Sequence, residues 1–187
     1  MIKDKLKRIE TGIVIKQDIS EKQAKKVFLA IGSNLGNKII NIEKAKYKLQ
    51  NSFIKILRSS SSYESLSWPD TTKPKYINIV IKVKTTLSPI NLLKLCNKIE
   101  FEIGRKRFGK NEPRVCDIDI IDYDQKIIRL KKPNDLIIPH PRMIKRNFVL
   151  LPLYEIAKNW KHPVNKVNIT KLISFLNDDD LRTIKQI

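Results

Sequence analysis

The chain has 187 residues, of which 41% are apolar, and this length and composition suit one globular domain with a substantial core. Lys and Arg number 38 against 19 Asp and Glu, which gives a net charge of +19. Such a charge favours polyanionic partners, namely nucleic acid, phosphorylated small molecules or an anionic membrane surface. No segment is long and apolar enough to cross a bilayer, and the amino terminus lacks the apolar segment of a secretion signal, so we expect a cytoplasmic protein.

The first 26 residues mix charged residues with few large apolar ones and show no periodicity. They predict a mobile or loosely packed extension, followed by a single domain over residues 27–187. Cys96 and Cys116 are the two cysteines of the chain, and both lie at apolar positions of predicted elements, without a second Cys or His at zinc spacing. We expect both to be reduced core residues.

The domain begins with a strand, a tight turn and a helix. Val27–Ile31 is a short apolar run typical of a buried strand, and it ends at the turn Gly32–Gly36. Apolar residues recur at helical spacing over Ile39–Leu49 and predict a helix. Phe53–Leu57 then predicts a second strand.

The next segments predict a loop, a strand and a helix. Trp68 lies in the polar, proline-punctuated loop Leu66–Lys75, and alternation over Ile77–Val83 predicts a half-buried strand. Ser88 suits an N-cap and Gly104 a C-cap, which predicts a helix over Pro89–Ile103. Asn97 and Glu100 lie three residues apart on one flank of this helix, from which they could face a site.

The stretch Pro113–Ile121 predicts the strand around which the chain is organised. Asp117 and Asp119 alternate with apolar residues, so both carboxylates face the same side, with alpha carbons roughly 6.5–7 Å apart. Carboxylate oxygens are the ligands that Mg²⁺ prefers, and paired ions of phosphoryl-transfer sites sit about 3.5–4 Å apart. The pair is therefore a candidate site for one or two ions. The alternative is an edge strand with an acidic outer face.

The predicted elements follow the order strand, helix, strand, strand, helix, strand. This order predicts an α+β protein with a ferredoxin-like core, in which helices cover one face of an antiparallel sheet. A basic loop, Arg105–Arg114, leads into the Asp117 strand, and helices are expected over residues 148–157 and 170–176 after the core.

The uncovered face of such a sheet would carry the Asp117 pair together with Asn78 and His140. Five arginines lie in the segments around it: Arg105, Arg107, Arg114, Arg142 and Arg146. Metal ions and arginines that face one cleft describe a polyphosphate site, because both neutralise charge on a transferring phosphoryl group. The sequence has no Walker pattern, so side chains would build most of the site.

Several segments in order resemble the 6-hydroxymethyl-7,8-dihydropterin pyrophosphokinase family, from Val27 to about His162. They are Ala30–Gly36, Ser62–Ser65 with Tyr76–Asn78, Ile99–Glu100 with Gly104–Arg105, Pro113–Ile120, and Pro139–Met143 with Arg146 and Phe148–Leu150. The resemblance implies transfer of the β and γ phosphates of ATP, as one unit, to the hydroxymethyl group of the pterin, with release of AMP. It also implies a probable monomer that could contact dihydropteroate synthase, and neither a nucleic-acid nor a membrane partner.

By matching positions, the resemblance also assigns residues. Asp117 and Asp119 would hold two Mg²⁺ ions, and Arg105 and Arg114 would act with them in catalysis. The ATP-binding set would be Asn97, Glu100, Arg105, Arg114, His140 and Arg146. The pterin pocket would be formed by Ser65, Tyr76, Asn78 and Phe148, with the amide of Asn78 reading the ring and Phe148 stacking on it.

One departure from the family pattern concerns a lid. The family usually has an aromatic residue and Gly just before the Pro-Arg of the metal strand, where this chain has Asn111-Glu112. Phe108 lies a few residues earlier and either replaces that aromatic residue or leaves the contact absent. We expect the Arg105–Arg114 loop and the Trp68 loop to close over the substrates.

Two alternatives stand beside this interpretation. A ferredoxin-like RNA-binding module would fit the fold and the charge, but it would place stacking aromatic residues on the central strands, where this chain has Asp117 and Asp119. A catalytically dead relative would serve as an interaction domain. The presence of both aspartates, His140 and Asn78 argues against it.

Overall fold

The computed structural model describes residues 23–67, 70–106, 112–131 and 135–187. Its main sheet follows the order β5-β1-β4-β3-β8, with β2 also paired to β4. The strands of this sheet are β1 (Lys25–Ser33), β2 (Lys55–Ser59), β3 (Tyr63–Ser65), β4 (Tyr76–Thr85), β5 (Asp117–Tyr123) and β8 (Ile184–Gln186). A small second sheet pairs β6 (Ile128–Leu130) with β7 (Leu136–Ile138).

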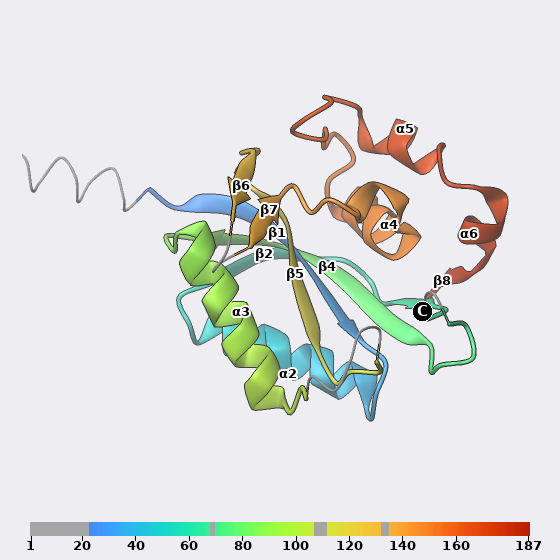
Figure 1. Cartoon of the computed structure of the whole chain (residues 1–187), viewed down its shortest axis with the longest axis horizontal. Helices are drawn as coiled ribbons and strands as arrows, with labels where there is room; N and C mark the ends of the chain where they lie inside the picture. The colour runs from blue at the N-terminus through green and yellow to red at the C-terminus, as the bar shows by residue number, and fades with distance from the viewer. Residues whose placement is uncertain (1–22, 68–69, 107–111, 132–134) are drawn as a thin grey trace, which may run out of the picture.

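Helices lie on both sides of the main sheet (Figure 1). On one side are α2 (Lys38–Gln50) and α3 (Pro89–Ile103), and on the other are α4 (Asn147–Ile156), α5 (Ile169–Ile173) and α6 (Asp178–Arg182), with the 3-10 helix η1 (Met143–Lys145) before α4. No helix of the described residues is long and apolar enough to span a membrane.

The pairing of the strands confirms the predicted ferredoxin-like core. Central strand β1 runs antiparallel to β4 on one side and to β5 on the other, while β2 and β3 both pair with the outer edge of β4. The helices α2 and α3 occupy the two crossover positions of the expected order. The helix predicted over Pro89–Ile103 has those bounds, because the Ser88 side chain accepts a hydrogen bond from the Asn91 N–H and Gly104 ends the helix at φ 108°.

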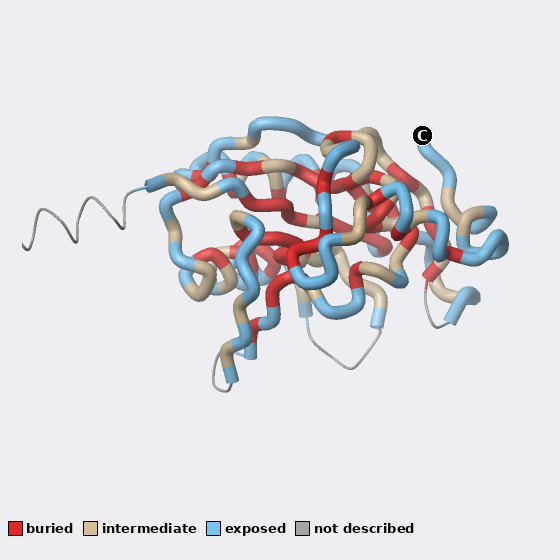
Figure 2. The backbone as a smooth tube through the Cα atoms, turned by 90° about the horizontal axis from the view of Figure 1, so that it is seen from above, coloured by how far each residue is buried: buried red, intermediate tan, exposed pale blue. Residues whose placement is uncertain are grey.

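Two apolar cores form because side chains alternate along each strand. One core lies between the sheet and the helices α2 and α3 and includes Leu29, Ile81 and Ile118. The other lies between the sheet and α4 and includes Val80 and Ile121. Figure 2 shows the buried residues gathered in the interior, with exposed residues on the loops and outer surfaces.

The helical cover differs from the expectation in one respect. We expected the second face of the sheet to be uncovered, but α4 packs across its middle and buries Val80 and Ile121. The apolar sequence of α4 provides the reason, because it must be covered on one side. The end of the face that carries Asp117 and Asp119 stays partly exposed.

The bounds of four strands differ from the prediction, and one of them, predicted over Ile77–Val83, spans Tyr76–Thr85. The first strand begins at Lys25, two residues before the expected apolar run, and residues 1–22 of the expected extension lie outside the described residues. Phe53 was expected in a strand, but it is 91% exposed in a left-handed turn at φ 62°, and β2 begins at Lys55. The strand predicted over Pro113–Ile121 begins at Asp117.

Ser60 closes the gap that separates β2 from β3 along the edge of β4. Its backbone N–H donates to the carbonyl of Val80 at 3.0 Å, and its hydroxyl accepts the Val80 N–H at 3.0 Å. The side chain thus replaces a backbone acceptor where the strand pairing is interrupted. Ser60 is buried, so water cannot easily take over this bond.

Replacing Ser60 with alanine should therefore lower the free energy of unfolding by about 1–3 kcal/mol, because the buried Val80 N–H loses its acceptor. Urea unfolding of the wild type and the variant measures this difference. The matched control is Ser59→Ala, since Ser59 is exposed and should change stability by less than about 0.5 kcal/mol. Equal stabilities of the two variants would contradict the role given to Ser60.

Candidate active site

The two carboxylates of β5 lie on the face of the sheet opposite α2 and α3. Ile118 and Ile120 belong to the core under those helices, while the side chains of Asp117 and Asp119 remain 28% and 32% exposed. The alternation expected from the sequence is confirmed. The two side chains therefore present oxygen ligands to the same space.

Guanidinium groups hold both carboxylates. Arg105 Nη1 lies 2.7 Å from Asp117 Oδ1, and Arg114 Nη1 lies 3.1 Å from Asp117 Oδ2. Arg146 Nη1 lies 3.0 Å from Asp119 Oδ2. Each carboxylate is thus neutralised by partly buried cations, and charge-assisted bonds of this kind fix the geometry of both partners.

Glu100 connects the end of α3 to this cluster. It is 3% exposed, its Oε1 accepts the Ile118 N–H at 2.7 Å, and the same oxygen lies 2.6 Å from Arg105 Nη1. Burial raises the pKa of the Glu100 carboxyl, while the Ile118 N–H and Arg105 oppose that rise. Glu100 therefore orients Arg105 toward Asp117 and ties α3 to the start of β5. Asn97 lies three residues earlier on α3 and is exposed.

His140 also faces Asp119, with its Nε2 at 3.7 Å from Asp119 Oδ2, the oxygen that Arg146 contacts. Burial lowers the pKa of His140, with Arg146 and Arg142 adding to the effect and Asp119 opposing it. The imidazole is therefore neutral near pH 7. Its Nδ1 accepts the Arg142 N–H at 3.2 Å, which leaves the proton on Nε2 and makes that atom a donor toward the cluster.

A second group of predicted residues lies beside the carboxylates on β4 and β3. Asn78 Nδ2 donates to Ser65 Oγ at 2.9 Å, and both residues are buried. Gly32 on β1 lies opposite both Asn78 and Asp117, so the three residues form one row across the sheet. A Cβ on Gly32 would lie 2.9 Å from Asn78 Oδ1, so only glycine leaves this amide in place.

Each of the two aromatic residues of the predicted pocket lies beside a residue of the site, Tyr76 beside Gly32 and Phe148 beside Arg146. Tyr76 lies two residues before Asn78, and its ring is 3.5 Å from the position of a Cβ on Gly32. Burial raises the pKa of Tyr76, with Arg114, Asp117 and Arg105 as its charged neighbours. The ring of Phe148 lies under Arg146, whose Cζ is 5.4 Å from the ring centroid. The structure thus brings the expected pocket and the expected phosphate-binding arginines together.

The role of Asn34 was missed by the sequence analysis. Its side-chain oxygen accepts the Arg114 N–H at 2.7 Å, and its amide donates to the Pro74 carbonyl at 3.1 Å and to Ser67 Oγ at 3.3 Å. Asn34 is 2% exposed, so it fixes two loops at the end of β1. A polar residue between a buried strand and a helix was the signal that could have identified it.

Some predicted residues of the site cannot be placed. Arg107, Phe108 and Trp68 lie outside the described residues, so the lid and the substitution by Phe108 stay predictions. Arg142 is described and exposed, and its backbone N–H, as noted, bonds to His140.

The residues that could hold a metal ion are Asp117 and Asp119. Among the described residues, no group of three or more His, Cys, Asp or Glu side chains is arranged to bind one. Two carboxylates alone suit Mg²⁺ bound to a phosphorylated substrate, because Mg²⁺ commonly takes one or two carboxylates and completes its shell with phosphate oxygens and water.

Comparison with known proteins gives a consistent result. Residues 28–158 match the family model of 7,8-dihydro-6-hydroxymethylpterin-pyrophosphokinase (HPPK). A 2-amino-4-hydroxy-6-hydroxymethyldihydropteridine pyrophosphokinase of Aquifex aeolicus is 43% identical over 138 residues, which cover 74% of this chain and 84% of the relative. The folic acid synthesis protein fol1 of Pneumocystis carinii is 39% identical over 158 residues, which cover 84% of this chain. The match spans only 21% of that longer relative.

A solved structure supports the fold. Wild-type HPPK-DHPS of Plasmodium falciparum, crystallised with pteroate, superimposes with a TM-score of 0.70 at 16% identity. The match covers 88% of this chain and 46% of that protein.

Replacing Asn34 with alanine should release the Arg114 segment, because the Arg114 N–H loses its acceptor. We expect amide exchange at Arg114 to accelerate and the free energy of unfolding to fall by about 1–3 kcal/mol. Hydrogen exchange with residue resolution measures the first effect. The control is Asn91→Ala on the exposed side of α3, and unchanged protection of Arg114 in Asn34→Ala would contradict the assignment.

Proposed function

The chain belongs to the 7,8-dihydro-6-hydroxymethylpterin-pyrophosphokinase family, and on that premise we propose that it transfers pyrophosphate from ATP to 6-hydroxymethyl-7,8-dihydropterin. AMP is the second product, and the reaction belongs to folate biosynthesis. The observation that carries the proposal is the row Asp117, Gly32 and Asn78. In this row the Asp117 carboxylate, which is paired with two arginines, and the buried Asn78 amide lie on either side of Gly32.

Asp117 and Asp119 would hold two Mg²⁺ ions in this proposal. When bound, Mg²⁺ would neutralise charge on the transferring phosphates of ATP. The site must accept a polyanion although it contains two carboxylates, and each of these carboxylates already faces a cation. The arginines would offset the repulsion that two bare carboxylates would exert on ATP.

Arg114 and Arg146 are the residues best suited to bind the triphosphate. They are 19% and 20% exposed, and within the described residues each has one carboxylate partner. Each can therefore exchange a carboxylate oxygen for a phosphate oxygen by a small rotation of its side chain. His140 adds a neutral donor at Nε2, close to Asp119.

Arg105 and Glu100 have a different task in the proposal. Arg105 is 14% exposed and bound to both Glu100 and Asp117, so it positions the carboxylate that Arg114 shares. Glu100 is a positioning residue, because it acts through Arg105 and the Ile118 N–H. Asn97, which is exposed one turn earlier, would help to seat the nucleotide.

The pterin would bind beside the phosphates at Ser65, Asn78, Tyr76 and Phe148. The Asn78 amide has one N–H on Ser65, which leaves its oxygen and second N–H to read ring donors and acceptors. Phe148 offers a ring face for stacking, next to Arg146. This arrangement directs the hydroxymethyl group toward the arginines and carboxylates.

The RNA-binding alternative is not favoured, because the family match and the relatives point to a pyrophosphokinase. The presence of Asp117 and Asp119 on β5 argues against a catalytically dead relative, and a kinetic assay distinguishes the two. The monomeric state, the cytoplasmic location and a contact with dihydropteroate synthase stay predictions.

Asp117→Asn and Asp119→Asn should each reduce pterin-dependent consumption of ATP by at least roughly a hundredfold. The loss of a metal ligand costs about 3 kcal/mol or more of transition-state stabilisation. The experiment measures kcat and KM with ATP, Mg²⁺ and the pterin, and it checks folding by circular dichroism.

Asp124→Asn is the matched control, because Asp124 lies beyond the far end of the same strand. Its backbone is left-handed at φ 54°, which asparagine tolerates, so this variant should retain activity. Turnover within tenfold of the wild type in both test variants would refute the two-ion assignment.

A further inference from the structure

Beyond α4, the same face of the sheet carries a set of cations that the proposed reaction does not use. On β4, Asn78, Val80, Lys82 and Lys84 alternate with the residues of the α2 and α3 core and so share this face. Asn78 belongs to the candidate active site, and Val80 is buried in the core with α4. Lys82 and Lys84 therefore lie past the helix, with Lys84 about 20 Å from Asn78 by the strand rise.

Strand pairing places further cations directly opposite these lysines. Lys84 lies opposite Lys26 on β1 and opposite Lys55 on β2. Lys82 lies opposite Arg58 on β2, where a bulge shifts the register. We call this set of five residues on three neighbouring strands the basic ladder: Lys26, Lys55, Arg58, Lys82 and Lys84.

The cations of the basic ladder repel one another. Like charges directly opposite each other on neighbouring strands lie about 5 Å apart and destabilise the sheet. Within the described residues, none of the five forms an ion pair. Arg58 donates instead to the carbonyl of Ile156 at 3.3 Å, and Lys82 Nζ lies 5.6 Å from the ring centroid of Phe28. The sheet therefore bears a repulsion that an anionic ligand would relieve.

The carboxylates near the ladder have other partners. Asp122 accepts the Trp160 indole N–H at 2.7 Å and the Gln125 N–H at 2.9 Å. Asp124 lies 3.6 Å from the Lys25 ammonium.

Glu155 completes the set of nearby carboxylates, and it too has partners. It accepts hydrogen bonds from the Ser61 and Tyr63 hydroxyls, both at 2.9 Å. The ladder is thus left to bind an external anion.

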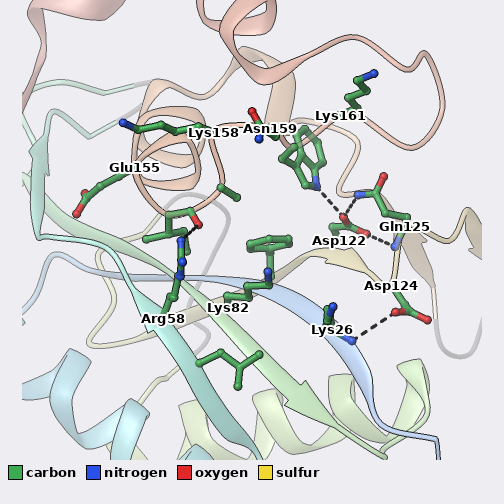
Figure 3. Close-up of a pocket in the computed structure, with 15 residues that line it drawn as sticks. Lys26, Arg58, Lys82, Asp122, Asp124, Gln125, Glu155, Lys158, Asn159 and Lys161 are labelled. Carbon is green, nitrogen blue, oxygen red and sulfur yellow. Dashed lines mark hydrogen bonds between the residues drawn. The ribbon is translucent and has the colours of Figure 1, made fainter.

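A groove of about 860 Å³ lies between the ladder and the segment that follows α4 (Figure 3). Lys26, Arg58 and Lys82 of the ladder lie along its sheet side, Lys158 and Lys161 border the opposite side, and the three carboxylates described above also line it. The concave shape suits a narrow chain, which can follow the groove and meet cations on several strands.

The aromatic residues of the groove limit what it can recognise. Phe28 and Trp160 are only 7% and 6% exposed, so neither offers a free ring face to a nucleobase. Proteins that bind single strands through their bases use exposed aromatic platforms for stacking. Recognition here would rest on charge, and the ammonium groups of four of the ladder residues act as point charges for phosphate.

We propose that the basic ladder binds a chain of phosphates through charge alone, at a site separate from the candidate active site. Two sources offer this chemistry, an inorganic polyphosphate or the backbone of a nucleic-acid strand. The site needs no Mg²⁺ and no pterin, and it reads no base sequence.

The test uses two variants of the full chain with the same net charge. Lys26→Gln/Lys82→Gln removes two cations of the ladder that line the groove, and Lys44→Gln/Lys94→Gln removes two exposed lysines from α2 and α3 on the opposite side of the sheet. Anisotropy of a short fluorescein-labelled oligothymidylate, titrated without Mg²⁺ at several salt concentrations, measures binding.

The ladder variant should bind on the order of tenfold more weakly than the wild type, and the slope of log K against log salt should fall by about 1.4, or 0.7 for each lost contact. The control variant should keep the affinity and slope of the wild type. Equal losses in both variants would overturn the proposal, because the oligonucleotide would then follow net charge alone.

Competition distinguishes the sources and the chemistry. Displacement by inorganic polyphosphate and by oligonucleotides of any sequence supports the proposal, and the tighter competitor at equal phosphate number identifies the source. Displacement by polyglutamate at the same charge concentration would overturn the preference for phosphate. Strong dependence on oligonucleotide sequence would overturn recognition without base contacts.

Discussion

The candidate active site depends on the balance of charge between two carboxylates and the arginines that hold them. Asp117 alone would repel ATP, and the arginines around it offset that repulsion. Arg105 and Arg114 lie at the two ends of the loop before β5, and a buried residue fixes each end. Glu100 fixes Arg105, and Asn34 fixes the backbone of Arg114. The fold is needed to hold these charges together, because buried contacts fix both ends of the loop and Arg146 reaches Asp119 from 27 residues away.

The helix α4 divides one face of the sheet into two regions of different chemistry. Gly32 lies between Asp117 and Asn78 in the sheet, and its lack of a side chain prevents a clash with the amide. The helix α4 then crosses the face at Val80 and separates this end from the lysines beyond. The net charge of +19 is therefore not spread evenly, because part of it lies in register across three strands.

Local patterns predicted the core elements well, and nonlocal contacts explain what they missed. The alternation around Asp117 depends only on neighbours in the strand, and the caps of α3 lie next to it, so both were predicted correctly. Phe53 was misplaced because its β propensity is outweighed by a left-handed turn. The hydrogen bonds of Glu100 with the Ile118 N–H and of Asn34 with the Arg114 N–H join residues far apart in the sequence. No periodic pattern in the sequence predicts such bonds. The assignment of the site residues rests on the family resemblance, and their roles stay proposals.

The identity of the nucleotide product tests the central claim most directly. If the arginines and the carboxylates of β5 hold the triphosphate beside the pterin, the hydroxymethyl oxygen attacks the β phosphorus and the leaving group is AMP. Incubation with ATP, Mg²⁺ and 6-hydroxymethyl-7,8-dihydropterin, followed by separation of the nucleotides, should give AMP in an amount equal to the pterin diphosphate. ADP as the sole nucleotide product would contradict pyrophosphate transfer, and so would AMP formed at the same rate without the pterin.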